Sequence, residues 1–362
     1  MIVPKLNLNV SLLETAESRE QLLSEIRHAS LFGSACLIST DVLSEDQLAA
    51  LGRVVKQSSG FVNLQLQLAG LDDAPALELL NIGAAQIVTD AQQRDQFESI
   101  PDDRILIYRT SVDGAGQGDQ VFIDTPTVEQ LVDLEKQRID VCVDSAWLDQ
   151  NSETVVDYYC GVLQSDRPDG LWPTIICDSL GIALGLAYSN RESLLHAIAH
   201  RQGAYWSRSR GGLWVKGLTS GATQALHAIR FDCDADCLRF TVTQDPPGFC
   251  HRNTHTCFGE ERSIATVVQR LKERIDSPDA KSFTRKLAND AEMLQKKLLE
   301  EAGELAEANE GDDRYEVAWE AADVMYFSLV AMLNNGVGLE EVYAELARRM
   351  NRIVRRKNKL ES

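Results

Sequence analysis

The chain has 362 residues, more than a single hydrophobic core usually organises, so two or three domains are expected. Its formal net charge of −19 argues against nucleic-acid binding, because affinity for a phosphate backbone requires Lys and Arg to displace counterions. We expect a cytoplasmic protein that enters no membrane, since the sequence has no basic start followed by a long apolar run and no window of about 18 uninterrupted apolar residues.

Residues 1–165 alternate helix-like amphipathic runs with short β-prone runs, as in LLSEIRHASLFGSACLIS at 22–39. This alternation predicts an α/β domain with a parallel sheet, either open or closed into a partial TIM-barrel-like form. The Gly-rich run DGAGQGD at 113–119 precedes a strand-like run rather than a helix. We therefore interpret it as a surface turn and not as a nucleotide loop. No catalytic motif is visible in this domain.

Residues 166–260 open on a Pro- and Asp-rich turn and continue with several β-prone runs and one helical stretch, which predicts an α+β domain. Residues 261–281 are predicted to form a linker helix and a hinge. Residues 282–362 are predicted to form an all-α bundle of three helices, which a second chain completes. The three predicted helices cover 283–310, 314–335 and 339–357.

Three aspartates alternate in DCDADC, at Asp232, Asp234 and Asp236. On an extended strand, residues two apart point to the same face, so the three carboxylates should converge while Cys233 points away. Carboxylate oxygens suit Mg²⁺, and the sequence therefore predicts a magnesium site in this segment.

The eight cysteines do not resemble a secreted disulfide framework, and the last four cluster as metal ligands do in a reducing compartment. Cys233, Cys250 and Cys257 offer three thiolates, and three protein ligands plus a water are typical of catalytic Zn²⁺. The alternative is a closed structural zinc site with His251 or His255 as the fourth ligand. We interpret Cys237 as an ordinary buried thiol.

The segment 201–221 is basic and rich in hydroxyl groups, without a single acidic residue in an otherwise acidic chain. Such a composition suits the binding of a phosphate monoester, although a solvated basic strand pair is the alternative. The candidate substrate-binding residues are Arg201, Ser207, Arg208, Ser209, Arg210, Lys216, Thr219 and Ser220.

The blocks YWSRSRGGLWVKGLTSGATQ, DCDADCLRFTV and GFCHRNTHTCFGE resemble the signature blocks of phosphoribosyl-AMP cyclohydrolase. The resemblance implies Mg²⁺ on the three aspartates and Zn²⁺ on the three thiolates Cys233, Cys250 and Cys257, shared across a homodimer interface. It also implies that zinc-bound hydroxide attacks C6 of an N1-ribosylated adenine and opens the N1–C6 bond, with His251 as the candidate for proton transfer. Leu218 departs from the family block, which often has glutamate at that position.

Two groups of carboxylates occur at helical spacing near the end of the chain. Glu300, Glu301 and Glu304 lie within one helical turn, and Glu320 and Asp323 are three apart. Acidic residues on a helix usually form a solvated face. Here Glu320 and Asp323 lie among apolar residues, and burying an unneutralised carboxylate against a core costs free energy. The apolar neighbours are Trp319, Val324, Met325, Tyr326 and Phe327.

This arrangement, together with SFTRKL at 282–287, resembles phosphoribosyl-ATP pyrophosphohydrolase, a relative of the MazG-type nucleotide pyrophosphohydrolases. The resemblance implies that all five carboxylates hold Mg²⁺ on the triphosphate and that water cleaves between the α- and β-phosphates. It makes Lys297 a weaker candidate for a phosphate contact and leaves the general base unassigned.

Together the two resemblances imply two consecutive hydrolytic steps of histidine biosynthesis. The whole chain resembles the N-terminal part of the fungal trifunctional histidine-biosynthesis protein, and the resemblance does not reach its histidinol dehydrogenase portion. Two alternatives stay open. In the first, only one domain is active and residues 1–165 serve as a regulatory or interaction module. In the second, the chain is a nucleotide-binding zinc protein without turnover.

Overall fold

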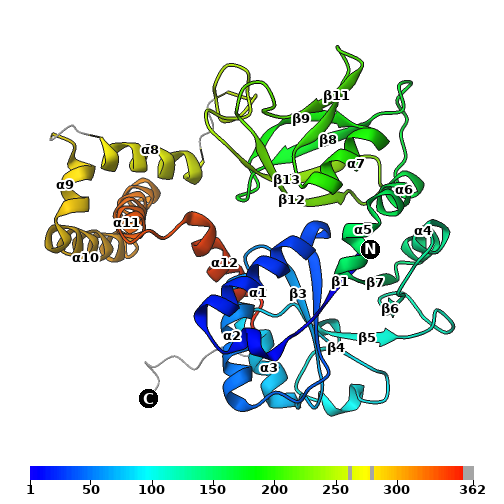
Figure 1. Ribbon diagram of the computed structural model, residues 1–362. Coiled ribbons are helices and arrows are strands. Elements are labelled where there is room, and N and C mark those ends of the chain that lie inside the picture. Colours follow the sequence, from blue (N-terminus) through cyan, green and yellow to red (C-terminus); the bar gives the residue numbers. More distant parts are fainter. Residues whose placement is uncertain (260–262, 278–280, 354–362) are drawn as a thin grey trace. The chain divides into compact units, whose positions relative to one another are not determined.

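The computed structural model describes residues 1–259, 263–277 and 281–353. The chain divides into two compact units, which we describe separately (Figure 1). The first contains residues 1–259 and the end of the chain from residue 344, and the second contains residues 260–343. No helix in the described ranges combines the length and the apolar character needed to cross a bilayer. Parts of the predicted linker, hinge and last helix, at 260–262, 278–280 and 354–362, lie outside the described residues.

The N-terminal part of the first unit is a closed barrel of seven parallel strands in chain order (Figure 1). The predicted parallel α/β domain is therefore confirmed, in its closed form, because the last strand pairs with the first. The strands are β1 (Ile2–Asn7), β2 (Ser34–Ser39), β3 (Asn63–Leu68), β4 (Gln86–Thr89), β5 (Ile105–Arg109), β6 (Gln120–Phe122) and β7 (Asp140–Asp144). The helices are α1 (Ala16–Ala29), α2 (Glu45–Ser58), α3 (Asp73–Ile82), α4 (Val128–Lys136), α5 (Ser145–Gln150) and α6 (Ser152–Val162).

Local sequence explains where these helices begin. Thr15, Ser44 and Thr127 are N-cap residues of α1, α2 and α4, and each forms a reciprocal capping box with the residue three positions later. Nearly all residues of these strands are buried or half-buried, as expected for a barrel covered by helices. The predicted turn at 113–119 is a turn in the structure, with Gly114 and Gly118 at positive φ.

The middle segment builds a four-stranded sheet in the order β12, β13, β8, β9, with a two-stranded hairpin and one helix (Figure 1). Only the β13–β8 pair is parallel. The elements are β8 (Trp172–Cys177), β9 (Ala183–Ser189), α7 (Arg191–His200), β10 (Ala204–Ser207), β11 (Gly212–Val215), β12 (Gln224–Phe231) and β13 (Leu238–Gln244).

Barrel and sheet share one hydrophobic core within the first unit, and Tyr159 of α6 lies where they meet. Its ring centroid is 5.9 Å from that of Phe32 in the barrel and 5.9 Å from that of Phe231 on β12. Its hydroxyl donates to the backbone oxygen of Ile229 at 3.3 Å. Tyr159 therefore connects the barrel to the sheet.

We expect Tyr159→Ala to destabilise the barrel and the sheet together by about 3–5 kcal/mol, because it removes a large buried ring and leaves a cavity. Tyr159→Phe removes only the hydroxyl and should cost about 1 kcal/mol. Chemical denaturation followed by fluorescence measures both values. A loss below 1 kcal/mol for the alanine variant would contradict this role.

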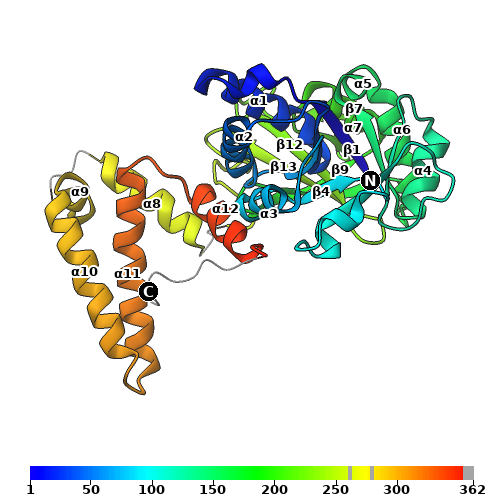
Figure 2. The same ribbon diagram turned by 90° about the horizontal axis from the view of Figure 1, so that it is seen from below.

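The second unit is helical, and α10 packs along α11 (Figure 2). The helix predicted over 283–310 is interrupted, which corrects the prediction. The Asp290 carboxylate accepts a hydrogen bond from the Met293 N–H at 2.9 Å and so begins a new helix. Its elements are α8 (Ile264–Asp276), α9 (Phe283–Asn289), α10 (Ala291–Ala308), α11 (Arg314–Asn334) and the beginning of α12 (Leu339–Met350), which belongs to the first unit from residue 344.

Candidate active sites

The three aspartates of DCDADC lie in the turn between β12 and β13 and not on a strand. Asp232 Oδ1 accepts hydrogen bonds from the backbone N–H groups of Asp236 at 3.0 Å and Cys237 at 3.1 Å. The three carboxylates bring ligand atoms within 4.8 Å of one another. Their convergence is as predicted, but the strand geometry offered for it is wrong, because a tight turn with Ala235 at φ +58° produces it.

These carboxylates repel one another. The pKa of Asp236 is raised, mainly by the negative charge of Asp234, with smaller contributions from desolvation and from Asp232. A divalent cation would relieve this repulsion, and an all-oxygen donor set suits Mg²⁺. The turn therefore fits the ion that the sequence predicted.

The loop that follows β13 carries Cys250 and Cys257. The N–H of Cys257 donates to the Leu184 oxygen of β9 at 2.8 Å, and the N–H of Cys250 donates to the Thr254 oxygen at 3.1 Å. Gly248 has φ +133°, and a Cβ there would lie 2.5 Å from the Thr254 oxygen, so a side chain does not fit. These contacts fix the loop that carries the two thiols.

The two thiols contact each other but differ in environment. The pKa of Cys250 is lowered, first by the backbone N–H of Arg252 and then by the Thr254 side chain. Burial raises the pKa of Cys257. Among the described residues, no third His, Cys or carboxylate ligand atom lies within 4.8 Å of both sulfurs. Cys233, the predicted third ligand, is exposed on the β12–β13 turn.

The two histidines of this loop differ in their contacts. His251 Nδ1 lies 4.0 Å from Cys250 Sγ, next to the thiols. His255 Nε2 lies 3.2 Å from the Asp178 carboxylate, to which it can donate. Asp178 thus competes for His255, one of the two histidines considered as an alternative fourth zinc ligand.

Lys216 is buried beside the thiols, where its ammonium lies 5.3 Å from the centre of the Phe249 ring. Burial lowers the pKa of Lys216, and the charges of Cys257 and Cys250 oppose this effect. A buried ammonium next to two sulfurs favours their thiolate forms. The structure thus places this predicted substrate-binding residue against the predicted zinc ligands.

The β10–β11 turn exposes Arg208, Ser209 and Arg210, and the next turn exposes Thr219 and Ser220. Hydroxyl oxygens of Ser207 and Ser209 are 3.5 Å apart, so they can act on one ligand. The Leu218 side chain is 79% exposed, so packing does not explain why leucine stands where the family block often has glutamate.

Sequence reasoning missed Tyr188 and Arg167, which hold Arg208. The guanidinium carbons of Arg208 and Arg167 lie 4.0 Å and 4.6 Å from the centre of the Tyr188 ring. Arg167 is fixed in turn by two hydrogen bonds to Asp169, at 2.9 Å and 2.7 Å. No spacing pattern connects these residues, because they come from two turns and one strand.

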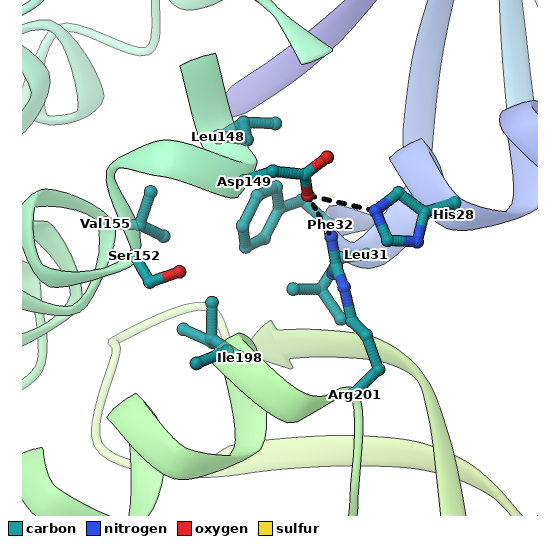
Figure 3. A pocket seen from close by; sticks show the side chains of 10 residues that line it. His28, Leu31, Phe32, Leu148, Asp149, Ser152, Val155, Ile198 and Arg201 are labelled. Carbon is teal, nitrogen blue, oxygen red and sulfur yellow. Dashed lines mark hydrogen bonds and ion pairs between the residues drawn. The ribbon is translucent and has the colours of Figure 1, made fainter. Parts of the chain in front are cut away.

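Arg201 lies in a different cavity, of about 280 Å³, which no other predicted substrate-binding residue lines (Figure 3). It ends α7 in the left-handed conformation, with φ +53°. Its Nη2 lies 3.5 Å from Asp149 Oδ1, and His28 Nε2 lies 2.9 Å from the same oxygen (Figure 3). The left-handed cap thus turns Arg201 towards the barrel helix α5.

In the second unit, Glu301 and Glu304 of α10 and Glu320 of α11 bring ligand atoms within 4.8 Å of one another. Glu301 is only 8% exposed. The pKa of Glu320 is raised, first by desolvation and then by the charges of Glu304 and Glu301, and its Oε2 is buried without a hydrogen-bond partner among the described residues. Such a donor set fits a divalent cation.

The other predicted residues surround this triplet. Lys297 Nζ lies 3.2 Å from Glu300 Oε2 and 3.5 Å from Glu301 Oε1, and these carboxylates, Glu300 first, raise its pKa. Asp323 adds to the negative charge at Glu320. The apolar neighbours of Glu320 and Asp323 are only partly buried: Trp319 and Met325 are 58% and 52% exposed, whereas Phe327 is buried.

Two family models match the chain. The model for phosphoribosyl-AMP cyclohydrolase matches residues 185–259, which contain the aspartate turn and the thiol loop. The model for phosphoribosyl-ATP pyrophosphohydrolase matches residues 264–350, which contain the glutamate triplet. The second match includes α8, a segment that sequence analysis assigned to a linker.

Curated relatives match half of the chain or more. The histidine biosynthesis trifunctional protein of Saccharomyces bayanus is 34% identical over 91% of this chain and 39% of its own length. The histidine biosynthesis bifunctional protein his7 of Schizosaccharomyces pombe is 36% identical over 65% of this chain and 57% of its length. The histidine biosynthesis bifunctional protein HisIE of Parasynechococcus marenigrum is 37% identical over 50% of this chain and 89% of its length. The chain therefore spans about two fifths of the trifunctional relative.

Proposed function

The chain belongs to the family of the histidine biosynthesis bifunctional protein HisIE, and we propose on this basis that it catalyses two consecutive hydrolytic steps of histidine biosynthesis. The second unit releases pyrophosphate from phosphoribosyl-ATP, and the cyclohydrolase segment opens the adenine ring of the resulting phosphoribosyl-AMP. One observation carries the proposal: each matched segment contains a carboxylate triplet with ligand atoms within 4.8 Å. Product analysis of the purified chain with phosphoribosyl-ATP, Mg²⁺ and Zn²⁺ tests it.

In the cyclohydrolase segment we assign the three aspartates of the turn to Mg²⁺ and the thiolates of Cys233, Cys250 and Cys257 to Zn²⁺. Bound Zn²⁺ supplies a Lewis acid that lowers the pKa of water towards about 7. Lys216 favours the thiolate forms of the ligands. The phosphate is bound by Ser207 at the end of β10 and by the exposed basic and hydroxyl groups of the two turns, Arg208, Ser209, Arg210, Thr219 and Ser220.

His251 is the proposed proton donor of ring opening. Water adds to C6 of the adenine, the N1–C6 bond breaks, and N1 gains a proton, so one water molecule is consumed. His251 lies next to Cys250 in sequence and its ring is exposed, so it can give this proton to N1.

In the second unit we assign Glu300, Glu301, Glu304, Glu320 and Asp323 to Mg²⁺. Bound Mg²⁺ neutralises charge on the triphosphate. Lys297 breaks its ion pairs with Glu300 and Glu301 and contacts a phosphate oxygen instead. Water attacks phosphorus and forms a new P–O bond, the bridging P–O bond between the α- and β-phosphates breaks, and pyrophosphate leaves.

We further propose that the chain acts as a homodimer in which Cys233 of one copy completes the zinc site of the other. The support is the placement of Cys250 beside Cys257 while Cys233 lies on a separate exposed turn. A zinc site within a single copy would require all three thiolates of that copy to meet at one point.

Mixing two inactive variants tests this dimer. Cys233→Ser and Cys250→Ser are each expected to lose ring opening. After mixing under conditions that exchange subunits, half of the dimers are mixed and each holds one intact site, so about one quarter of the activity should return. If activity stays absent while subunit exchange is verified, the zinc ligands come from a single copy.

A further inference from the structure

A cavity of about 360 Å³ opens at the carboxyl ends of barrel strands β2 to β5. Residues that end β2, follow β3 and follow β4 line it, together with Tyr108 on β5. The carboxyl ends of the strands are where barrels of alternating strands and helices hold their ligands. Neither predicted hydrolase site uses this cavity.

Gln67 supplies an unsatisfied acceptor in this cavity. Two residues earlier on the same strand, Gln65 accepts from Gln120 Nε2 at 2.8 Å across the barrel, which places Gln65 and therefore Gln67 on the inner face. Gln67 Oε1 is buried, and it has no hydrogen-bond partner in the part of the chain that the structure describes. A buried acceptor without a donor is unfavourable, so the site favours a ligand that donates a hydrogen bond.

The lining residues also favour a cation. They include two carboxylates, Asp72 and Asp90, and no Lys, Arg or His. Asp72 occupies the N-cap position of α3 but its side chain makes no capping hydrogen bond, so its carboxylate is not used by the helix. A phosphorylated ligand would meet two carboxylates and no cationic side chain in this lining, which disfavours the substrates of the two hydrolase sites.

The rings of Tyr108 and Phe97 add aromatic surface to the lining. An ammonium group gains from carboxylates and from aromatic faces, and a flat apolar body gains from burial against rings. Charge, hydrogen bonding and shape thus favour the same kind of molecule.

We propose that the barrel mouth binds a small aromatic amine whose ammonium pairs with Asp72 and whose second donor, a ring N–H or O–H, binds Gln67 Oε1. This assigns a binding function to residues 1–165, a segment that lies outside both family models. It is independent of the two hydrolase activities.

Calorimetric titration of the full chain tests the proposal with tyramine and histamine as probes. Phenethylamine, which lacks the second donor, should bind about tenfold more weakly than tyramine, and 3-(4-hydroxyphenyl)propionate, which reverses the charge, should not bind. Failure of both probes to bind at up to about 10 mM, or equal binding of the carboxylate, would overturn the proposal.

Variants locate the site. Asp72→Asn and Gln67→Met should each weaken tyramine binding about tenfold. The control Asp46→Asn removes an exposed carboxylate from the first turn of α2, outside the cavity, and should leave binding unchanged. Both hydrolase activities should be unaffected in all three variants. Unchanged tyramine affinity in Asp72→Asn, whose side chain is exposed and whose replacement should fold, would place binding elsewhere.

Discussion

Cys250→Ser is expected to reduce ring opening of phosphoribosyl-AMP by roughly a thousandfold while pyrophosphate release continues. Cys250 is the thiol whose pKa is lowered by the Arg252 N–H and the Thr254 side chain, and it contacts Cys257 beside the buried Lys216. A serine hydroxyl stays protonated at neutral pH and is a poor ligand for Zn²⁺. Phosphoribosyl-AMP should therefore accumulate, and chromatography of the products measures it.

Cys237→Ser is the matched control for this variant. Cys237 lies at the end of the aspartate turn, half-buried, with its thiol 3.6 Å from the Leu238 oxygen, and it is not one of the three proposed zinc ligands. Its replacement should leave ring opening within about twofold of the unmodified chain. Retention of ring opening in Cys250→Ser, or an equal loss in both variants, would contradict the zinc assignment.

Glu320→Gln is expected to reduce pyrophosphate release by roughly a thousandfold, while ring opening of supplied phosphoribosyl-AMP is unchanged. The amide keeps the shape of the side chain but removes the charge that a divalent cation needs. Desolvation and the charges of Glu304 and Glu301 raise the pKa of Glu320 in the folded state. The ionised carboxylate therefore destabilises the fold at neutral pH, and the variant without Mg²⁺ should be at least as stable as the unmodified chain.

Glu307→Gln is the control, because Glu307 is exposed on α10 outside the triplet. It should keep both activities. Thermal unfolding without and with Mg²⁺ separates the two roles of Glu320: Mg²⁺ should stabilise the unmodified chain and the control, but not Glu320→Gln. If Mg²⁺ stabilises all three equally, the glutamate triplet is a solvated acidic face and not a metal site.

The sequence pattern predicted which elements form better than how they meet. Alternating strands and helices predicted a parallel α/β domain, but they left its closure open. Closure depends on pairing Ile2 with Val141, across most of the domain, and no local pattern encodes such a contact. The break before α10 had a local signal, since Asp290 is a residue type favoured at N-caps, but helical periodicity masked it.

In the candidate sites, too, the sequence predicted the residue types better than their positions in space. Alternate spacing on an assumed strand predicted that Asp232, Asp234 and Asp236 converge, although a turn with a positive φ at Ala235 produces the convergence. Composition grouped Arg201 with the phosphate-binding residues, but the left-handed end of α7 turns it to Asp149 (Figure 3). Backbone conformation at single non-glycine residues has little sequence signature, so such errors are expected.

We propose that one chain carries out both steps in order. The most direct measurement supplies phosphoribosyl-ATP, Mg²⁺ and Zn²⁺ to the purified chain and follows pyrophosphate release and the ultraviolet change of adenine-ring opening in the same time course. We expect pyrophosphate first, a transient rise of phosphoribosyl-AMP, and then the ring-opened product. Pyrophosphate release without ring opening would confine activity to the second unit, and the absence of both signals would contradict the proposed function.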